Sequence, residues 1–189
     1  SEHKVPTMAH LTCVGSARDD ISKFLEDASS SGISNILALR GDPPPGEESF
    51  VKAKGGFEFS HELVAYVKSY ERFGIGVAGF PEGHPGCPNR LLEMTHLKAK
   101  VDAGADYICT QLFFDNRDFY DFQDRCRLAG ITVPIIPGIM LIMAYGGFKR
   151  MTGFCKSRVP EDVMAKVEEG EGTDRKGGGG ELGSMGPEK

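Results

Sequence analysis

Polar and charged side chains that could bind a ligand recur where apolar segments of the chain end. Arg40 and Asp42 follow the apolar segment 35–39, and His10 lies near the end of the segment 5–12. An arginine can hold a phosphate group, and a carboxylate can act on a reacting group. Taken alone, this arginine–glycine–aspartate sequence is more often a plain surface turn. His10 is equally open to a structural hydrogen bond and to ligand contact.

A second group of polar residues follows further along the chain. His84 lies among proline and glycine residues, which are typical of a turn. Gln111 is an amide within an apolar segment, so it must either pair inside the protein or face a ligand. Glu93, His96 and Lys100 are spaced to share one face of a helix. That face is either solvated, with an internal ion pair, or a row of polar contacts to an extended cofactor.

The histidines do not predict a metal centre. His10, His84 and His96 could converge in the fold, but no ligand-spacing motif joins them. The five cysteines are scattered and never form a C-x-x-C pair, which argues against a disulfide framework or structural zinc and favours a reducing, cytoplasmic location. Neither the glycine fingerprint of Rossmann folds nor a P-loop sequence occurs, so these two nucleotide sites are not predicted.

Apolar segments alternate with helical patterns along the chain. We expect strands over 5–12, 35–41, 74–80, 107–113 and 133–139, and helices over 19–30, 60–70, 91–103 and 115–129. This alternation predicts an α/β fold with a parallel sheet covered on both faces. A doubly wound sheet and a (β/α)8 barrel both fit. Polar residues at the ends of several strands favour the barrel, because barrels build their sites there and doubly wound sheets use one switch point.

Length and charge narrow the classes of protein. The chain has 189 residues, enough for one domain but short of the roughly 250 of a complete barrel. It starts without methionine and enters a strand at once, so we expect a sequence cut on its N-terminal side. The net charge of -5 argues against nucleic acid as a partner, and no apolar segment is long enough for a membrane span. Residues 1–165 form the expected domain, and the glycine-rich tail 166–189 is expected to be disordered.

Six segments closely resemble the methylenetetrahydrofolate reductase family, in order and with ordinary spacings. They are HLTC (10–13), NILALRGDPP (35–44), VAGFPEGHP (77–85), LKAKVDAGADYICTQLFFD (97–115), VPIIPGIM (133–140) and RMTGFCKSRVP (150–160). The resemblance covers about residues 5 to 165, and the last segment is most similar to eukaryotic members, plants and algae especially.

The resemblance implies a fold and an activity. The fold would be a partial (β/α)8 TIM barrel with about five of the eight strand–helix units and with FAD at the carboxyl ends of the strands. NADPH or NADH would reduce the flavin, which would pass hydride to 5,10-methylenetetrahydrofolate and give 5-methyltetrahydrofolate for methionine synthesis. The protein would supply position and electrostatics. The folate is the implied substrate, and the full-length protein would be a homo-oligomer.

The resemblance also assigns roles to residues. Asp42 would be catalytic and, with Gln111, would contact the folate substrate. The family's proton-donating glutamate would lie upstream of residue 1. The implied FAD contacts are His10, Arg40, Gly41, Asp42, Phe59, Ser60, Phe80, His84, Pro85, Glu93 and Lys100.

The sequence departs from the family pattern at several positions. Phe80 replaces a tyrosine, Glu93 replaces an aspartate, and Leu141-Ile142-Met143 replaces a proline–isoleucine–amide sequence, which removes a polar substrate contact. Two alternatives therefore stay open. One is a catalytically inactive truncated product that at most binds FAD or a full-length partner. The other is a different barrel enzyme that acts on a phosphorylated metabolite.

Overall fold

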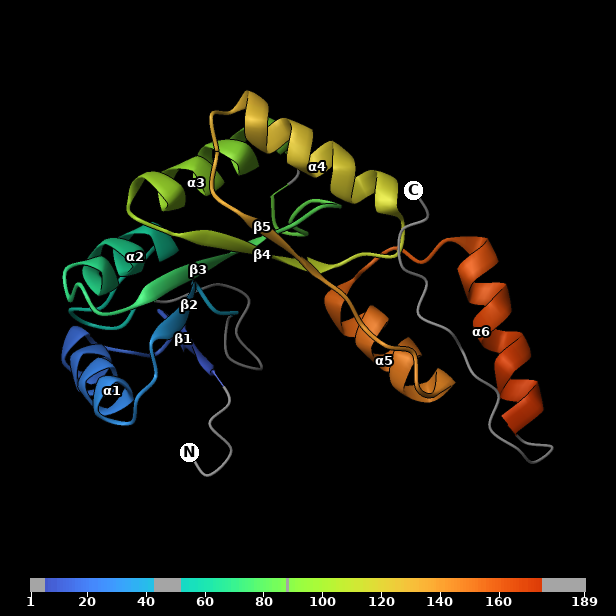
Figure 1. The fold of residues 1–189 in the computed structure, drawn as a ribbon, viewed down its shortest axis with the longest axis horizontal. Helices are drawn as coiled ribbons and strands as arrows, with labels where there is room; N and C mark the ends of the chain where they lie inside the picture. The colour runs from blue at the N-terminus through green and yellow to red at the C-terminus, as the bar shows by residue number, and fades with distance from the viewer. Residues whose placement is uncertain (1–5, 43–51, 88, 175–189) are drawn as a thin grey trace.

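The computed structural model describes residues 6–42, 52–87 and 89–174. Strands and helices alternate along these residues (Figure 1). The strands are β1 (Met8–Thr12), β2 (Asn35–Leu39), β3 (Gly74–Gly79), β4 (Tyr107–Leu112) and β5 (Ile135–Gly138). The helices are α1 (Arg18–Ser30), α2 (Ser60–Lys68), α3 (Arg90–Asp102), α4 (Asn116–Leu128), α5 (Tyr145–Cys155) and α6 (Glu161–Asp174).

The five strands form one parallel sheet in sequential order, β1-β2-β3-β4-β5. A doubly wound sheet reverses its strand order at a switch point, whereas a barrel adds each strand beside the previous one. The described strands contain no such reversal, so the barrel prediction is confirmed and the doubly wound alternative is wrong. The carboxyl ends of all five strands consequently lie along one edge of the sheet.

The main hydrophobic core lies between one face of the sheet and the helices α1 to α4, which follow that face in an arc (Figure 1). Alternate residues of each strand point to this face. Its fully buried members include Ile36, Ile75, Val77 and Ile108 from the strands and Leu25, Leu63, Val67 and Phe122 from the helices. Helices α1 to α4 all lie along this one face of the sheet. Apolar strands alone could not show this, because barrel strands also turn apolar side chains inward.

Tyr107 crosses the opposite face of the sheet. Its hydroxyl donates a hydrogen bond to Met8 Sδ at 3.1 Å, joining β4 to β1. Gly76 makes this possible, because a Cβ atom there would lie 2.5 Å from Tyr107 Cε2. The aromatic ring thus takes the space that a β3 side chain would otherwise fill.

The β5 strand closes against β4 through an irregular register between Cys109 and Leu112. Gly138 N donates to Thr110 Oγ1 at 2.9 Å, and a Cβ atom on Gly138 would lie 2.2 Å from the Thr110 carbonyl oxygen. Pro134 O accepts from Ile108 N at 2.9 Å. Because alternate backbone groups of a strand point to opposite edges, Pro137 faces the outer edge of β5.

The two C-terminal helices, α5 and α6, had no counterpart among the predicted elements. Helix α6 continues through Asp174, with Val167 buried, so secondary structure does not end at residue 165 as expected for a tail that begins at 166. Helix α6 packs against α5 instead of standing alone. Residues 175–189, which include most of the predicted tail, lie outside the described residues. No described helix is long and apolar enough to cross a membrane.

Candidate active site

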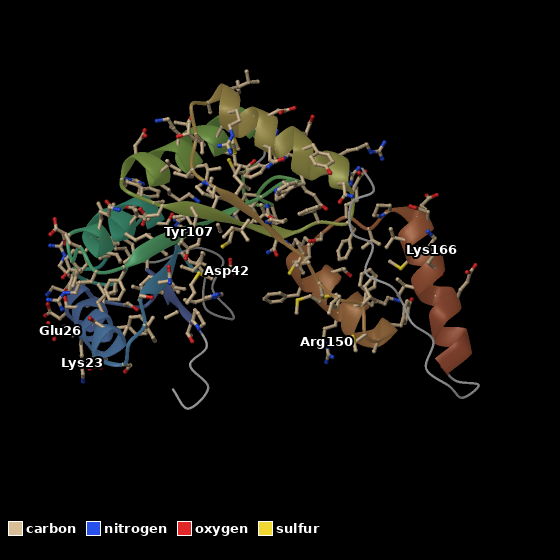
Figure 2. The ribbon with its side chains drawn as sticks, in the orientation of Figure 1. Lys23, Glu26, Asp42, Tyr107, Arg150 and Lys166 are labelled. Carbon is tan, nitrogen blue, oxygen red and sulfur yellow. The ribbon has the colours of Figure 1, made fainter. Side chains whose placement is uncertain are left out.

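The loop after β2 packs against the segment that follows β1. Gly41 has a φ of 84°, and a Cβ atom there would lie 2.5 Å from Val14 Cγ1, so both backbone and space require glycine. Arg40 Nε donates to Glu58 O at 3.2 Å, and its guanidinium lies 5.5 Å from the centroid of the Phe59 ring. Asp42 follows, exposed, on the side of the sheet away from α1 (Figure 2). The Arg-Gly-Asp sequence is therefore a constrained turn with an outward carboxylate.

The start of α2 lies beside Arg40. Glu62 Oε2 accepts from the backbone N–H groups of Glu58 and Phe59 at 2.8 and 3.2 Å, which fixes where the helix begins. The Phe59 side chain remains 42% exposed and stacks on His61. Ser60, partly buried, is the first helical residue. Arg40, Phe59 and a helix N-terminus thus face solvent together, an arrangement that favours an anionic ligand.

The loop after β3 presents Phe80 and His84. Their rings meet edge to face with centroids 4.6 Å apart. The backbone N–H of His84 donates to Glu93 Oε1 at 3.0 Å, and His84 Nδ1 accepts from Gly86 N at 3.0 Å. Because Nδ1 accepts, the proton of the neutral imidazole resides on Nε2, which can then donate to a ligand. Pro85 is exposed in the same turn.

Helix α3 supplies the charged groups behind this loop. Asn89 caps the helix, since its side chain accepts from Leu91 N and Leu92 N at 3.0 and 3.2 Å. Glu93 is buried at 7% exposure; its Oε2 lies 3.8 Å from Arg90 Nη1 and has no hydrogen-bond partner among the described residues. Lys100 Nζ donates to Ala78 O at 3.0 Å. Burial lowers the pKa of Lys100 to about 8, against the opposing effect of the Glu93 charge. A buried carboxylate and a buried amine therefore lie at the end of β3.

His96 does not join this pair. It was expected to share a face with Glu93 and Lys100, but it is exposed while Glu93 is buried and Lys100 is partly buried. At about 100° per residue His96 is rotated about 60° from Glu93, so it lies at the edge of the face that enters the core. The prediction of a single polar row is wrong for His96.

Electrostatics link the β2 and β3 loops. Burial lowers the pKa of His84; the Lys100 and Arg40 charges act in the same direction, and those of Glu93 and Asp42 oppose it. Residues from two loops and α3 therefore share one local field. The structure brings together the predicted residues of these three elements.

His10 and Gln111 lie on the flanking strands. His10 is exposed in the middle of β1, opposite Leu37, and not at the strand end. Gln111 lies near the end of β4, partly buried, and its Oε1 accepts from Leu112 N at 2.8 Å. The acceptor of the amide thus pairs inside the protein, while the amide group also carries two donor hydrogens.

The segment after β5 is apolar. Leu141 and Met143 are 66% and 82% exposed. With residues of α5 they line a cavity of about 570 Å³ whose further members are Met140, Ala144, Gly147, Phe148, Arg150, Met151 and Phe154. No group of three metal-binding side chains occurs within the described ranges.

Sequence reasoning missed four charged residues around the β3 loop. Arg125 Nη2 donates to Pro81 O at 2.9 Å, and Glu82 Oε2 accepts from the backbone N–H of Arg158 at 2.8 Å. The Arg158 guanidinium donates to Asp118 Oδ2 at 2.6 Å. Glu82 and Arg158 are 76 positions apart in the chain, so no local spacing could reveal the contact.

A parallel sheet in sequential order, with helices along one face and charged groups gathered at its strand ends, defines a barrel-type α/β domain. Enzymes of this class build their ligand sites at those ends. The sequence comparisons identify which family of such domains is present. The chain belongs to the methylenetetrahydrofolate reductase family, whose model matches residues 1–179.

Relatives in plants and bacteria agree with this family. The chain is 48% identical to methylenetetrahydrofolate reductase (NADH) 1 of Zea mays and 46% identical to that of Arabidopsis thaliana, over 87% of this chain and 30% of each relative. It is 40% identical to 5,10-methylenetetrahydrofolate reductase of Salmonella typhimurium, over 84% of this chain and 52% of the relative. The chain thus spans about 30% of the length of the plant relatives.

Among solved structures, a protein assigned as a deoxyribose-phosphate aldolase from Coccidioides immitis has a TM-score of 0.43 and 12% identity, over 69% of this chain and 46% of that chain. This likeness is too distant to carry an argument.

Proposed function

We propose that this chain forms part of the flavin and folate site of a methylenetetrahydrofolate reductase. The reaction is the FAD-dependent reduction of 5,10-methylenetetrahydrofolate to 5-methyltetrahydrofolate with NADPH or NADH as the hydride donor. Family membership, together with the Glu93, His84 and Lys100 cluster at the end of β3, is the observation that carries this proposal. The name of the Zea mays relative specifies NADH and that of a Caenorhabditis elegans relative specifies NADPH, so both donors are retained.

The groups at the strand ends suit a ligand such as FAD, which carries two phosphates and many hydroxyls. Arg40 and Lys100 are the cations, and the N-terminus of α2 adds partial positive charge. Glu93 Oε2, buried without a hydrogen-bond partner among the described residues, can accept from a ligand hydroxyl. His84 Nε2 can donate, and Phe59 and Phe80 offer ring surfaces. His10, Gly41, Ser60 and Pro85 complete the proposed contact set. FAD, when bound, would supply the hydride chemistry.

Asp42 is the proposed catalytic residue. Its exposed carboxylate, held by the constrained Gly41 turn, would stabilise positive charge in its neighbourhood. The negative charge of the carboxylate favours the cationic iminium form of the folate substrate, which is the form ready to accept hydride. Gln111 would donate its amide hydrogens to the pterin, because its oxygen is already paired with Leu112 N.

Three variants test this assignment. The 189-residue chain is incubated with FAD and desalted, and the retained flavin absorbance is measured before an NADPH- and NADH-dependent reductase assay. We expect Lys100→Met to lose flavin. The matched control Lys98→Met removes a lysine of the same helix whose partner is Asp102 at the surface, and should retain it. Asp42→Asn should keep the flavin and lower turnover at least tenfold, about 1.4 kcal/mol.

Two results would count against the proposal. A chain that retains no flavin while it remains folded excludes the cofactor site. An Asp42→Asn chain that binds flavin and reduces the folate as fast as the parent chain rejects the catalytic role of Asp42.

A further inference from the structure

The backbone of the loop after β3 is held at three points by charged side chains from α3 and α4. Arg125 donates to the Pro81 carbonyl at 2.9 Å, and Arg90 donates to the Glu82 carbonyl. Glu93 accepts from the His84 N–H at 3.0 Å. Each contact fixes a different peptide group, so little freedom remains between Phe80 and His84.

A fourth contact reaches the loop from the connection between α5 and α6. Helix α5 ends at Cys155, and its C-cap Lys156 has a φ of 54°. Beyond it, Ser157 Oγ donates to Leu112 O at 2.9 Å, and the Arg158 N–H donates to Glu82 Oε2 at 2.8 Å. The connection thus lies across the ends of both β3 and β4. Glu82 is the side chain through which the β3 loop meets it.

The surroundings of Glu82 disfavour the charged form of its side chain. Its Oε1 is buried and has no hydrogen-bond partner among the described residues. Burial raises the pKa of Glu82, the Asp118 charge adds to this effect, and the Arg158 charge opposes it. A surface loop could satisfy Arg158 N–H with water at no such cost. The retained contact therefore calls for a role beyond stability.

We propose that Glu82 is a positioning residue: its carboxylate couples the α5–α6 connection to the β3 loop and so sets where Phe80 and His84 lie in the candidate active site. The consequence for flavin rests on the proposed function. The coupling between Glu82 and His84 does not, because every contact on which it depends lies within this chain.

Four variants separate the hydrogen bond from the charges around it. Glu82→Ala removes the acceptor, whereas Glu82→Gln removes the charge and keeps an oxygen that can accept. Arg158→Pro deletes the donating N–H, whereas Arg158→Ala keeps that N–H and loses only the guanidinium bonded to Asp118. If the hydrogen bond matters, Glu82→Ala and Arg158→Pro should behave alike. Glu82→Gln and Arg158→Ala should stay close to the parent chain.

The first readout is the imidazole titration of His84, followed by NMR in the flavin-free 189-residue chain and assigned with His84→Gln. Burial lowers the His84 pKa in the parent chain. The other charges that reach it are Glu93 and Lys100 from α3 and Asp42 and Arg40 from the β2 loop, and all of these stay in place. His84 is already partly in solvent, and release of the loop removes the burial that remains, so Glu82→Ala and Arg158→Pro should raise the pKa toward its ordinary value. Glu82→Gln should not.

The second readout is the dissociation constant for FAD. We expect Glu82→Ala and Arg158→Pro to weaken binding about tenfold, the effect of one lost charge-assisted hydrogen bond. Circular dichroism verifies that each variant is folded. Where Glu82→Ala fails to fold, Arg158→Pro tests the same bond from its other side.

The outcomes distinguish the two proposals. An unchanged His84 titration in both Glu82→Ala and Arg158→Pro overturns the positioning role, whatever happens to FAD. Equal shifts in Glu82→Gln and Glu82→Ala also overturn it, because they would report the lost charge alone. A raised His84 pKa in a chain that binds no FAD upholds the coupling and rejects the flavin site.

Discussion

Lys100 should make the stability of this chain rise with pH in the alkaline range. Its amine is held against the Ala78 carbonyl, and burial lowers its pKa from 10.5 to about 8. In the unfolded chain the amine regains its ordinary pKa, so between these two values the unfolded state binds more protons than the folded state. Unfolding is then increasingly disfavoured as pH rises. The cost of keeping the ammonium charged is fully present below pH 8 and is relieved by about pH 10.5.

The size of the effect follows from the same two pKa values. A pKa lowered from 10.5 to about 8 corresponds to about 3 kcal/mol. Other groups titrate in this range: burial raises the pKa values of Cys13 and Cys126 to about 11, and that of Tyr107 is raised as well. These groups lower stability as pH rises, because their neutral forms are favoured in the folded chain. They are common to the parent chain and to Lys100→Met, so the difference in the free energy of unfolding between the two proteins reports the titration of Lys100 alone.

The assay is urea unfolding, followed by circular dichroism at intervals from pH 7 to pH 10.5. The free energy of unfolding of the parent chain, minus that of Lys100→Met, should rise by up to about 3 kcal/mol across this range. Lys98→Met, in which a surface ion pair with Asp102 is lost, should show no such rise. Glu93→Gln should move the start of the rise below pH 8, because the carboxylate stabilises the ammonium. A difference that stays flat with pH would refute the buried, charged lysine.

Two further predictions concern packing and capping. Gly138→Ala should destabilise the chain by about 2 kcal/mol or more, because the new Cβ atom meets the backbone oxygen of Thr110. Gly147→Ala, whose Cβ atom meets open space within α5, should stabilise the chain by up to about 1 kcal/mol. Equal urea midpoints for the two variants would contradict the geometry. Asn89→Ala should cost about 1 kcal/mol and Asn89→Asp much less, because only the alanine lacks an acceptor for the first turn of α3; equal midpoints would show that the cap contributes nothing.

The sequence predicted the central architecture because its strands are short, apolar and separated by helical patterns. Strands β1 to β5 lie within the predicted segments, and α1 to α4 agree with theirs to within a turn. The barrel choice came from polar residues at strand ends, and the sequential strand order confirmed it. Helix α5 escaped prediction because Gly146, Gly147 and Gly153 lower its intrinsic helix propensity, which its packing around Phe148 overcomes.

The candidate site was predictable as a set of residue types and not as a set of contacts. The turn at Gly41 and the pairing of Glu93 with the His84 backbone both involve predicted residues. The sequence could not show that the Gln111 oxygen is already paired, because that bond depends on a side-chain rotamer. Nor could it indicate the long-range contact between Glu82 and Arg158, because only the folded chain brings the α5–α6 connection near the loop after β3.

Pro137 limits which strands can pair with the outer edge of β5. An exposed strand edge is a template on which any other strand can add, and this is how sheets recruit unintended partners. Proline has no backbone N–H, so a strand that pairs along β5 lacks one interstrand hydrogen bond where Pro137 faces outward. An indiscriminate partner would leave a carbonyl oxygen there without a donor. Only a strand with a matched interruption, such as a bulge at that level, could join without this cost, so the edge discriminates among partners by backbone pattern before any side chain is involved.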